Sequence, residues 1–399
     1  MVSFKETLIE DLIDEIAMGP FGSNIKKECF VDEGIPVLNG SNLVGYALNE
    51  DSFGFVTEEK ADSLGRANAS RKDVVITHRG TLGQASFIPD DSQYERYVIS
   101  QSQFRVRCNE KILPEYLVYF LHSPIGQYRL LSNTNQVGVP ALGRPTSTFK
   151  KISVMLPDMT IQKNIVSILE TIRRKIETNN QINGNLSEQA KAIFKKELLK
   201  FEDVPEGWTK ASLDSIANYL NGLAMQKFRP KDTEKGIPVL KIKELRQGVC
   251  DEASELCSPG IKQEYIVNDG DVIFSWSGSL LVDFWCGGKC GLNQHLFKVT
   301  SKDYDKWFYY AWTLYHLDNF IFLAADKATT MGHIKREELT KAQVLIPSKE
   351  DYDRIGELLS PIYETIILKR IENKRLSTLR DSLLPKLMSG ELDVEEVDL

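Results

Sequence analysis

Apolar residues in two long stretches of the chain recur at alternating steps of three and four residues, the spacing that predicts an amphipathic helix. The first stretch follows Pro157 and the second follows Pro347. The two series superpose: Ile165, Leu169, Ile172, Ile176, Asn179, Asn183, Leu186, Ala190 and Ile193 in the first, and Ile355, Leu359, Ile362, Ile366, Lys369, Asn373, Leu376, Arg380 and Leu383 in the second. Each series predicts a helix of about 40 residues, which is about 60 Å at 1.5 Å per residue.

A helix of that length cannot bury its apolar stripe against a domain at one end, so we expect the two helices to pack on each other as an antiparallel pair. Asn183 corresponds to Asn373, and such a pair would either fix the register from a core position or lie on a solvated edge. Ser348 and Asp351 resemble an N-terminal cap. Gly184 lies inside the first series, where it costs about 1 kcal/mol and would mark a kink.

Strand-like segments are also duplicated. Gly34-Ile-Pro-Val-Leu38 recurs as Gly236-Ile-Pro-Val-Leu240, and each copy leads to an apolar strand closed by a proline, at 152–157 and 342–347. Between them the first copy predicts strands at 73–77 and 103–107, a turn at 80–83 and a helix at 114–130; the second predicts strands at 270–274 and 295–299, a turn at 277–279 and a helix at 305–322. A period near 190 residues is too long for a solenoid and indicates two whole domains.

These patterns predict an α/β or α+β protein in which two tandem domains alternate with two long helices, related by a pseudo-two-fold axis. The expected segments are a first domain (1–157), a central helix (158–200), a second domain (201–347), a C-terminal helix (348–390) and an acidic tail (391–399). A duplicated domain with a duplicated spacer is suited to reading two separate sites on one long ligand.

The net charge of −7 argues against a simple basic nucleic-acid binder. Residues 101–157 are nevertheless rich in Lys and Arg, while acidic residues gather in the first fifty positions and in the tail. We find no apolar run long enough to span a membrane and no secretory signal, so we expect a cytoplasmic protein without a membrane partner. The six cysteines are expected to be reduced thiols, and their spacing predicts no metal site.

The chain lacks the motifs of common catalysts. It contains no P-loop, no dinucleotide-binding glycine motif, no His-Glu-x-x-His and no Asn/Asp-Pro-Pro-Tyr/Phe tetrapeptide of amino-methyltransferases. These observations predict a binding protein that is not an enzyme. Two alternatives remain open: a metal-dependent nuclease that uses Asp51, Glu58 and Lys60, and a purely structural coiled-coil adaptor.

Two motifs resemble a known family. Met18-Gly-Pro-Phe-Gly-Ser-Asn24, followed by Gly34-Ile-Pro-Val-Leu38 and Gly40-Ser-Asn-Leu43, is similar to the opening of a target recognition domain in type I restriction–modification specificity subunits. Leu383-Leu-Pro-Lys-Leu-Met-Ser-Gly-Glu-Leu392 resembles the C-terminal signature of that family. The second domain departs from the pattern, because Asn221-Gly-Leu-Ala-Met225 replaces the first motif.

The resemblance implies the DNA specificity subunit of a multisubunit complex. Each target recognition domain would read one half of a bipartite site in double-stranded DNA, and the helices would space the halves and dock two methylation subunits. A restriction and translocase subunit is a further implied partner. No cofactor is expected in this chain; S-adenosylmethionine, ATP and Mg are expected on the partner subunits.

Base reading requires side chains with forked donors or acceptors on loops that project from a rigid scaffold. In the first domain the loop residues that meet this requirement are Arg66, Arg71, Lys72, Arg79, Thr81, Asn135, Gln136, Arg144 and Thr146. In the second domain they are Lys227, Arg229, Lys231, Ser277, Lys327, Thr329, Thr330, His333 and Lys335. Trp276 would either fill a core or stack on a ligand, and a core position is favoured.

Overall fold

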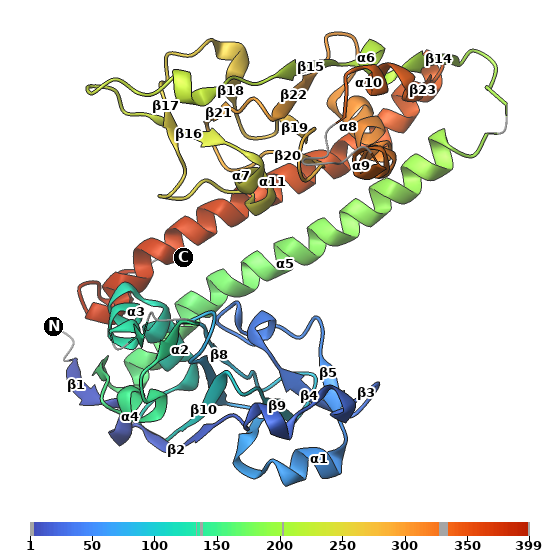
Figure 1. The fold of residues 1–399 in the computed structure, drawn as a ribbon. Coiled ribbons are helices and arrows are strands. Elements are labelled where there is room, and N and C mark those ends of the chain that lie inside the picture. The colour runs from blue at the N-terminus through green and yellow to red at the C-terminus, as the bar shows by residue number, and fades with distance from the viewer. Residues whose placement is uncertain (1–3, 133, 136–138, 202, 327–333, 398–399) are drawn as a thin grey trace. The chain divides into compact units, whose positions relative to one another are not determined.

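The computed structural model describes residues 4–132, 134–135, 139–201, 203–326 and 334–397. The chain divides into two units. The first unit comprises residues 1–173 and 378–399, and the second comprises residues 174–377. Each unit therefore contains one end of each long helix, α5 (Met159–Leu198) and α11 (Lys349–Ser389) (Figure 1).

The first unit is built on a four-stranded antiparallel sheet and a five-stranded mixed sheet. The four-stranded sheet has the order β2 (Ile13–Met18), β10 (Gln103–Cys108), β7 (Asp73–Thr77), β8 (Ala85–Phe87). The five-stranded sheet has the order β3 (Phe30–Val31), β5 (Gly54–Val56), β4 (Ile35–Leu38), β9 (Arg96–Ile99), β6 (Asn68–Ser70). Two short pairs complete the unit: β1 (Lys5–Leu8) with β13 (Ser153–Leu156), and β11 (Thr134–Asn135) with β12 (Ala141–Leu142).

The second unit repeats this plan. Its antiparallel sheet has the order β15 (Asn218–Asn221), β22 (Leu296–Thr300), β19 (Val272–Ser275), β20 (Leu281–Phe284). Its second sheet has the order β17 (Leu256–Cys257), β16 (Ile237–Leu240), β21 (Cys290–Leu292), β18 (Ile266–Val267), and β14 (Thr209–Ser212) pairs with β23 (Gln343–Ile346). The repeated Gly-Ile-Pro-Val-Leu motif forms β4 in one unit and β16 in the other, and each pairs in parallel with a neighbouring strand. The predicted duplication of an α+β domain is thus confirmed.

Short helices cover the sheets. In the first unit these are α1 (Glu58–Ser63), α2 (Pro114–His122), α3 (Pro124–Leu131) and α4 (Pro145–Lys150); in the second they are α6 (Leu213–Ile216), α7 (Ile242–Gln247), α8 (Lys306–Tyr315), α9 (Leu317–Asp326) and α10 (Glu337–Lys341). The predicted single helix at 114–130 is wrong. Proline lacks an amide donor and disfavours helical conformation in the residue before it, so Pro124 ends α2 and Ser123 caps α3.

The predicted single helix at 305–322 is also wrong, because α8 ends before His316 and α9 begins after it. No proline explains this second break. The His316 ring instead stacks on Trp312, and its Nε2 lies 2.9 Å from the carbonyl oxygen of Gln343, at the start of β23. The two units therefore share the broken helix although different residues produce it.

The long helices pack together and run antiparallel. In the first unit, Ile165 near the start of α5 shares a buried core with Leu387 near the end of α11. In the second unit, Phe194 near the end of α5 shares a core with Ile355 near the start of α11. The predicted cap of α11 is present, since the Asp351 amide donates to Ser348 Oγ over 3.2 Å.

Asparagines from both helices meet in the second unit, but not in the pair expected from the sequence. Asn179 is fully buried, and its Nδ2 donates to Asn373 Oδ1 over 2.8 Å and to a carboxylate oxygen of Glu372 over 2.9 Å. Asn373 in turn donates to Asn180 Oδ1 over 2.8 Å. The partner of Asn373 thus lies one helical turn before Asn183, because antiparallel helices pair positions in opposite order, whereas superposing two sequences pairs them in the same order.

Candidate nucleic-acid interface

One edge of the four-stranded sheet in the first unit gathers several polar loops. Strands β2 and β7 end there, and β10 and β8 begin there, because the strands are antiparallel. The loops at this edge span residues 18–24, 78–84 and 100–103. The hairpin of β11 and β12 joins them through a bridge between Arg79 and Ala141, and Leu142 donates its amide to the carbonyl of His78. We call these four segments the first loop edge.

Close backbone contacts hold the first loop edge together. Gly19 donates its amide to the Gln103 carbonyl over 2.8 Å. A Cβ at Gly19 would lie 1.9 Å from the Ser100 carbonyl oxygen, so only glycine fits at this position. His78 Nε2 lies 3.1 Å from the Gln101 carbonyl oxygen, and burial lowers the pKa of this imidazole. The neutral ring therefore serves as a connector between two loops.

Three predicted DNA-binding residues lie on the first loop edge. Arg79 and Thr81 are exposed on the loop that follows β7, and Thr81 Oγ1 donates to Gln84 Oε1 over 2.7 Å. Asn135 ends β11, and its neighbour Gln136 lies outside the described residues. Sequence reasoning missed Gln101, an exposed amide on the loop between β9 and β10, although its correspondence with Gln294 in the second copy was a usable signal.

Two other predicted residues lie at the opposite end of the same sheet. Arg71 and Lys72 directly precede β7, whereas Arg79 lies two residues after its end. Arg71 donates to the Ser92 carbonyl over 2.9 Å, and Lys72 Nζ lies 3.3 Å from an Asp90 carboxylate oxygen. A contact surface centred on the first loop edge therefore excludes both cations.

Arg66 belongs to an ion-pair network on β2, β7 and β10. Its Nε lies 3.0 Å from Glu15, which also accepts from the buried Arg105 over 2.9 Å. The hydrogen bond from Arg105 lowers the pKa of Glu15 despite partial burial. Asp73 is fully buried and receives two bonds from Arg107, at 2.9 and 3.0 Å. These cations compensate buried carboxylates, and this explains part of the basic character of residues 101–157.

Arg144 caps the N-terminus of α4 directly after the β11–β12 hairpin, and Thr146 lies in the first turn of α4. Arg144 is exposed and adopts a left-handed conformation with φ of +47°, which is unusual for a residue with a side chain. It lines a cavity of about 610 Å³ whose other residues are mainly hydroxyls and one cation: Ser132, Thr134, Gly143, Ser147, Thr148 and Lys151. The composition of this cavity suits an anionic ligand such as phosphate.

The second unit has a corresponding loop edge where β15 and β19 end and β22 and β20 begin. Its segments are residues 221–226, 276–280 and 293–295, and we call them the second loop edge. Trp276 is half-buried there, stacks on Phe297 and donates its indole N–H to Asn221 Oδ1 over 3.0 Å. Trp276 is therefore neither a fully buried core residue nor an open stacking platform. The predicted Ser277 is buried.

A cavity of about 450 Å³ opens at the second loop edge. Arg229 is the only predicted DNA-binding residue among those that line it: Met225, Gln226, Arg229, Lys241, Ile242, Lys243, Glu255, Asn293, Gln294 and His295. Glu255 binds both Lys241 and Arg229, and the hydrogen bond from Lys241 lowers the pKa of this carboxyl. The cavity thus presents paired charges and amides, and sequence reasoning missed most of its residues because they come from separate strands.

The remaining predicted residues of the second unit are dispersed. Lys227 and Lys231 are exposed around the short turn that follows the second loop edge, and Lys335 lies 3.6 Å from Glu337. Lys327, Thr329, Thr330 and His333 lie outside the described residues. Ile334 donates its amide to the Trp276 carbonyl, so the chain at Ile334 lies beside the second loop edge.

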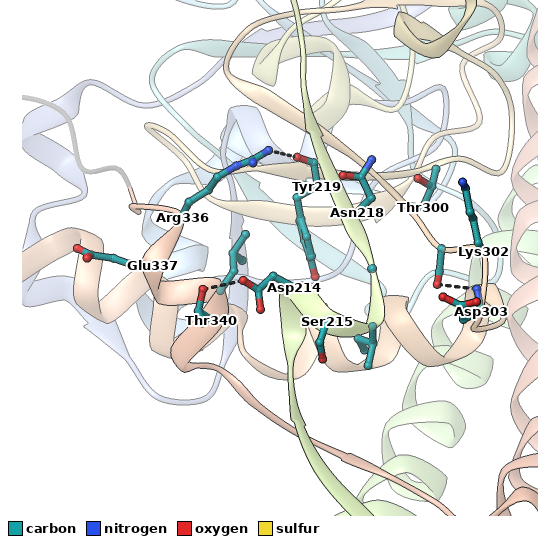
Figure 2. A pocket seen from close by; sticks show the side chains of 14 residues that line it. Asp214, Ser215, Asn218, Tyr219, Thr300, Lys302, Asp303, Arg336, Glu337 and Thr340 are labelled. Carbon is teal, nitrogen blue, oxygen red and sulfur yellow. Dashed lines mark hydrogen bonds between the residues drawn. The ribbon is translucent and has the colours of Figure 1, made fainter.

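Another cavity of the second unit, about 920 Å³, lies at the end of the sheet opposite to the second loop edge. It is lined by Asn218 at the start of β15 and Thr300 at the end of β22 (Figure 2). Arg336 is part of its wall and donates to the Tyr219 carbonyl, and Thr340 donates to Asp214 over 2.6 Å. Acidic and basic side chains alternate around it, and none of the predicted DNA-binding residues lines it.

The residues of the nuclease alternative come from two separate elements. Asp51 lies in a loop, where its amide binds Asn49 Oδ1, whereas Glu58 and Lys60 belong to α1. Within the part of the chain that the structure describes, no cluster of three or more His, Cys, Asp or Glu side chains could hold a metal ion. None of the described helices is long and apolar enough to cross a membrane.

Two segments, residues 21–188 and 205–378, match the family model of the type I restriction modification DNA specificity domain. The chain is 23% identical over 408 residues to the type I restriction enzyme MjaIX specificity subunit of Methanocaldococcus jannaschii, covering 96% of this chain and 93% of that protein. It is 20% identical to the HindI specificity subunit of Haemophilus influenzae, covering 87% and 93%. The crystal structure of the type I restriction–modification S subunit from M. genitalium shares the fold, with a TM-score of 0.60, 14% identity and coverage of 97% and 96%.

Proposed function

Because the chain belongs to the family of type I restriction–modification DNA specificity subunits, we propose that each unit reads one half of a bipartite DNA site through its loop edge. The specificity subunit recognises DNA with two target recognition domains and is not the catalytic component of such a system. The observation that supports separate half-sites is the repeated sheet, whose corresponding edges carry different side chains. Arg79 and Thr81 follow β7 in the first unit, whereas Ser277 and Ser279 follow β19 in the second.

Exchange of one unit tests this proposal. Residues 1–157 would be replaced by the corresponding segment of another family member, and the modified sequence would be read from the methylated genome of a host that expresses the whole system. We expect one half of the sequence to change and the other to persist. The reciprocal control, exchange of residues 201–347, should change the other half only. A change of both halves by either exchange would contradict independent reading.

We further propose that two methylation subunits bind this chain and carry S-adenosylmethionine, and that a restriction and translocase subunit carries ATP and Mg. The net charge of −7 supports dependence on partners, because a protein that neutralises many phosphates alone is normally basic. The isolated chain should therefore neither methylate nor cleave DNA, and methylation by the chain without partners would contradict this assignment.

We also propose that α5 and α11 set the spacing between the half-sites. A test would insert seven residues after position 184 of α5 and seven after position 368 of α11, which lie opposite each other in the register that pairs Asn179 with Asn373. A heptad preserves the apolar seam and lengthens each helix by about 10 Å. The methylated sequence should keep both halves and gain about three base pairs between them at 3.4 Å each. An active variant that keeps its original spacing would contradict the proposal.

A further inference from the structure

Phe21 presents an aromatic ring to solvent at the first loop edge. It is 81% exposed, more than any other large apolar side chain among the described residues. Phenylalanine has no polar atom that water could satisfy, so covering this ring with a ligand would be favourable. Its place on the first loop edge, among polar loops, makes Phe21 a candidate contact residue.

The loop that carries Phe21 is held rigidly. Gly19 is fixed by its hydrogen bond to Gln103, and Asn24 donates its amide to the Phe21 carbonyl over 2.8 Å. A Cβ on Gly22 would lie 2.2 Å from Gln101 Oε1, so the loop packs tightly on the segment between β9 and β10. Pro20 restricts the backbone directly before Phe21. A ligand that contacts this ring consequently binds a preformed surface, so binding costs little entropy for ordering the loop.

The surroundings of Phe21 indicate which ligand it meets. Gln101 is in contact with the loop, and His78 and Arg79 follow on the next strand end. Val139, 56% exposed, projects from the segment between β11 and β12 at the same edge. Amide and guanidinium groups beside apolar side chains match the base edges and thymine methyl groups of duplex DNA.

We propose that Phe21 inserts its ring into the base stack of duplex DNA in the half-site read by the first unit, and partly unstacks one base step. This inference rests on the proposed function. Apolar wedges of this kind open base steps, and an aromatic ring recovers part of the lost stacking energy by contact with the exposed base face. The contact favours sequences whose steps open readily, so it adds to the specificity of the polar side chains beside it.

The second unit lacks this wedge. Gly222 corresponds to Gly19, since it donates its amide to the carbonyl of Leu296 at the equivalent position of β22, and a Cβ there would lie 2.2 Å from the Asn293 carbonyl oxygen. Two residues later the second unit has Ala224 in place of Phe21, and the following Met225 is buried. Only the half-site read by the first unit should therefore be opened by an apolar wedge.

The test uses the full chain with its methylation subunits and a duplex of the sequence that the wild-type complex methylates. 2-Aminopurine, whose fluorescence rises when it unstacks, would replace in turn each adenine of both half-sites except the methylated adenines, because methyltransferases extrude the base that they modify. We expect a fluorescence rise in one half-site only. Phe21→Ala should abolish that rise and weaken binding by about tenfold or more, whereas Phe21→Trp should retain both. The salt dependence of affinity should not change, because Phe21 neutralises no phosphate.

Control measurements distinguish loss of the DNA contact from misfolding and from loss of a protein contact. Phe322→Ala removes another exposed ring, 69% exposed in α9 of the second unit, and should leave binding unchanged. The melting temperature of Phe21→Ala should match that of the wild type, since the ring is exposed. Binding and fluorescence that are unaffected by Phe21→Ala would overturn the wedge. Weakened assembly with the methylation subunits and intact DNA binding would also overturn it and identify a protein contact. Absence of sequence-specific binding by the wild-type complex would instead overturn the proposed function.

Discussion

The turn that leads into the central strand contains a lysine in one unit and a glycine in the other. Lys72 precedes β7 with φ of +68°, and Gly270 occupies the equivalent position before β19 with φ of +84°. Each donates its amide to a carbonyl at the far side of the hairpin, Ile88 in one unit and Trp285 in the other, over 2.8 and 2.7 Å. The hydrogen bonds thus define the turn, and one unit maintains it with a strained lysine while the other uses the residue that fits without strain.

The aspartate that follows each turn makes the same backbone hydrogen bond in both units but has different ionic surroundings. Asp73 and Asp271 both accept from a backbone amide three residues earlier, Ser70 or Asn268. Asp73 is buried among arginines, whereas Asp271 is partly exposed and pairs with Lys298 over 2.8 Å. A common backbone arrangement therefore tolerates different ionic surroundings, while the loop edges diverge most, from Phe21 to Ala224. The shared frame and the divergent edges are what independent reading of two half-sites requires.

Removal of the two acids should have unequal effects. Asp73→Ala leaves the buried Arg105 without a carboxylate partner on β7, which should cost the first unit about 3–5 kcal/mol. Asp271→Ala should cost about 1–3 kcal/mol, because Lys298 can also donate to the Ile266 carbonyl and reach water. Hydrogen exchange of peptides from β10 and β22 measures each unit separately. Equal losses of stability in the two variants would show that the deeper burial of Asp73 does not make it more important for stability than Asp271.

Exchanging the residue types at positions 72 and 270 should remove backbone strain from the first unit and introduce it into the second. Gly270→Lys should destabilise the second unit by about 1–3 kcal/mol, because a side chain is forced into the left-handed region. Lys72→Gly should relieve strain in the first unit, with a net change within about 1 kcal/mol because glycine also loses more chain entropy. All five tryptophans lie at or after position 208, so tryptophan fluorescence during urea unfolding follows the second unit alone. A Gly270→Lys variant as stable as the wild type would show that the turn is not constrained.

The cap at the start of α11 should contribute less stability at low pH. Hydrogen bonds from Trp208, Arg354 and Ser348 lower the pKa of Asp351 below its ordinary 3.8. The stabilisation is therefore complete above that value and is lost as pH falls through the lower value in the folded protein. The stability difference between the wild type and Asp351→Asn, followed by tryptophan fluorescence, should shrink below about pH 4. A difference that persists undiminished to lower pH would contradict a role for the charged carboxylate.

The smallest effect is expected at glycines within the long helices. A methyl group on Gly184 of α5 would meet open space, so Gly184→Ala should stabilise the helix by up to about 1 kcal/mol. Gly356 of α11 is the matched control, since its Cβ would lie 3.0 Å from the Trp307 indole nitrogen. Gly356→Ala should bring no gain. Thermal unfolding of both variants checks this contrast, and equal stabilisation would refute it.

The periodic patterns in the sequence correctly predicted the main secondary-structure elements and the duplication. The strands at 73–77 and 103–107, the two long helices and the duplication follow from local spacing of apolar residues, which the chain displays directly. The partner of Asn373 could not be read in this way, because it depends on the antiparallel register of two distant helices. Likewise Lys72 and Arg79 are near in sequence but lie at opposite ends of β7, and exposure of Phe21 follows from contacts of its neighbouring glycines with residues 100–103.

The most direct test of reading through the loop edges compares two exposed cations at opposite ends of β7. Arg79→Ala and Lys72→Gly each remove one positive charge from the first unit, and both would be assembled with the methylation subunits and titrated with the target duplex and with single-base variants. Arg79→Ala should cost about 1–3 kcal/mol and alter the preference at one base of one half-site, while Lys72→Gly should leave affinity and preference unchanged. Loss of specific binding with Lys72→Gly and unchanged binding with Arg79→Ala would contradict the assignment of the DNA-reading edge.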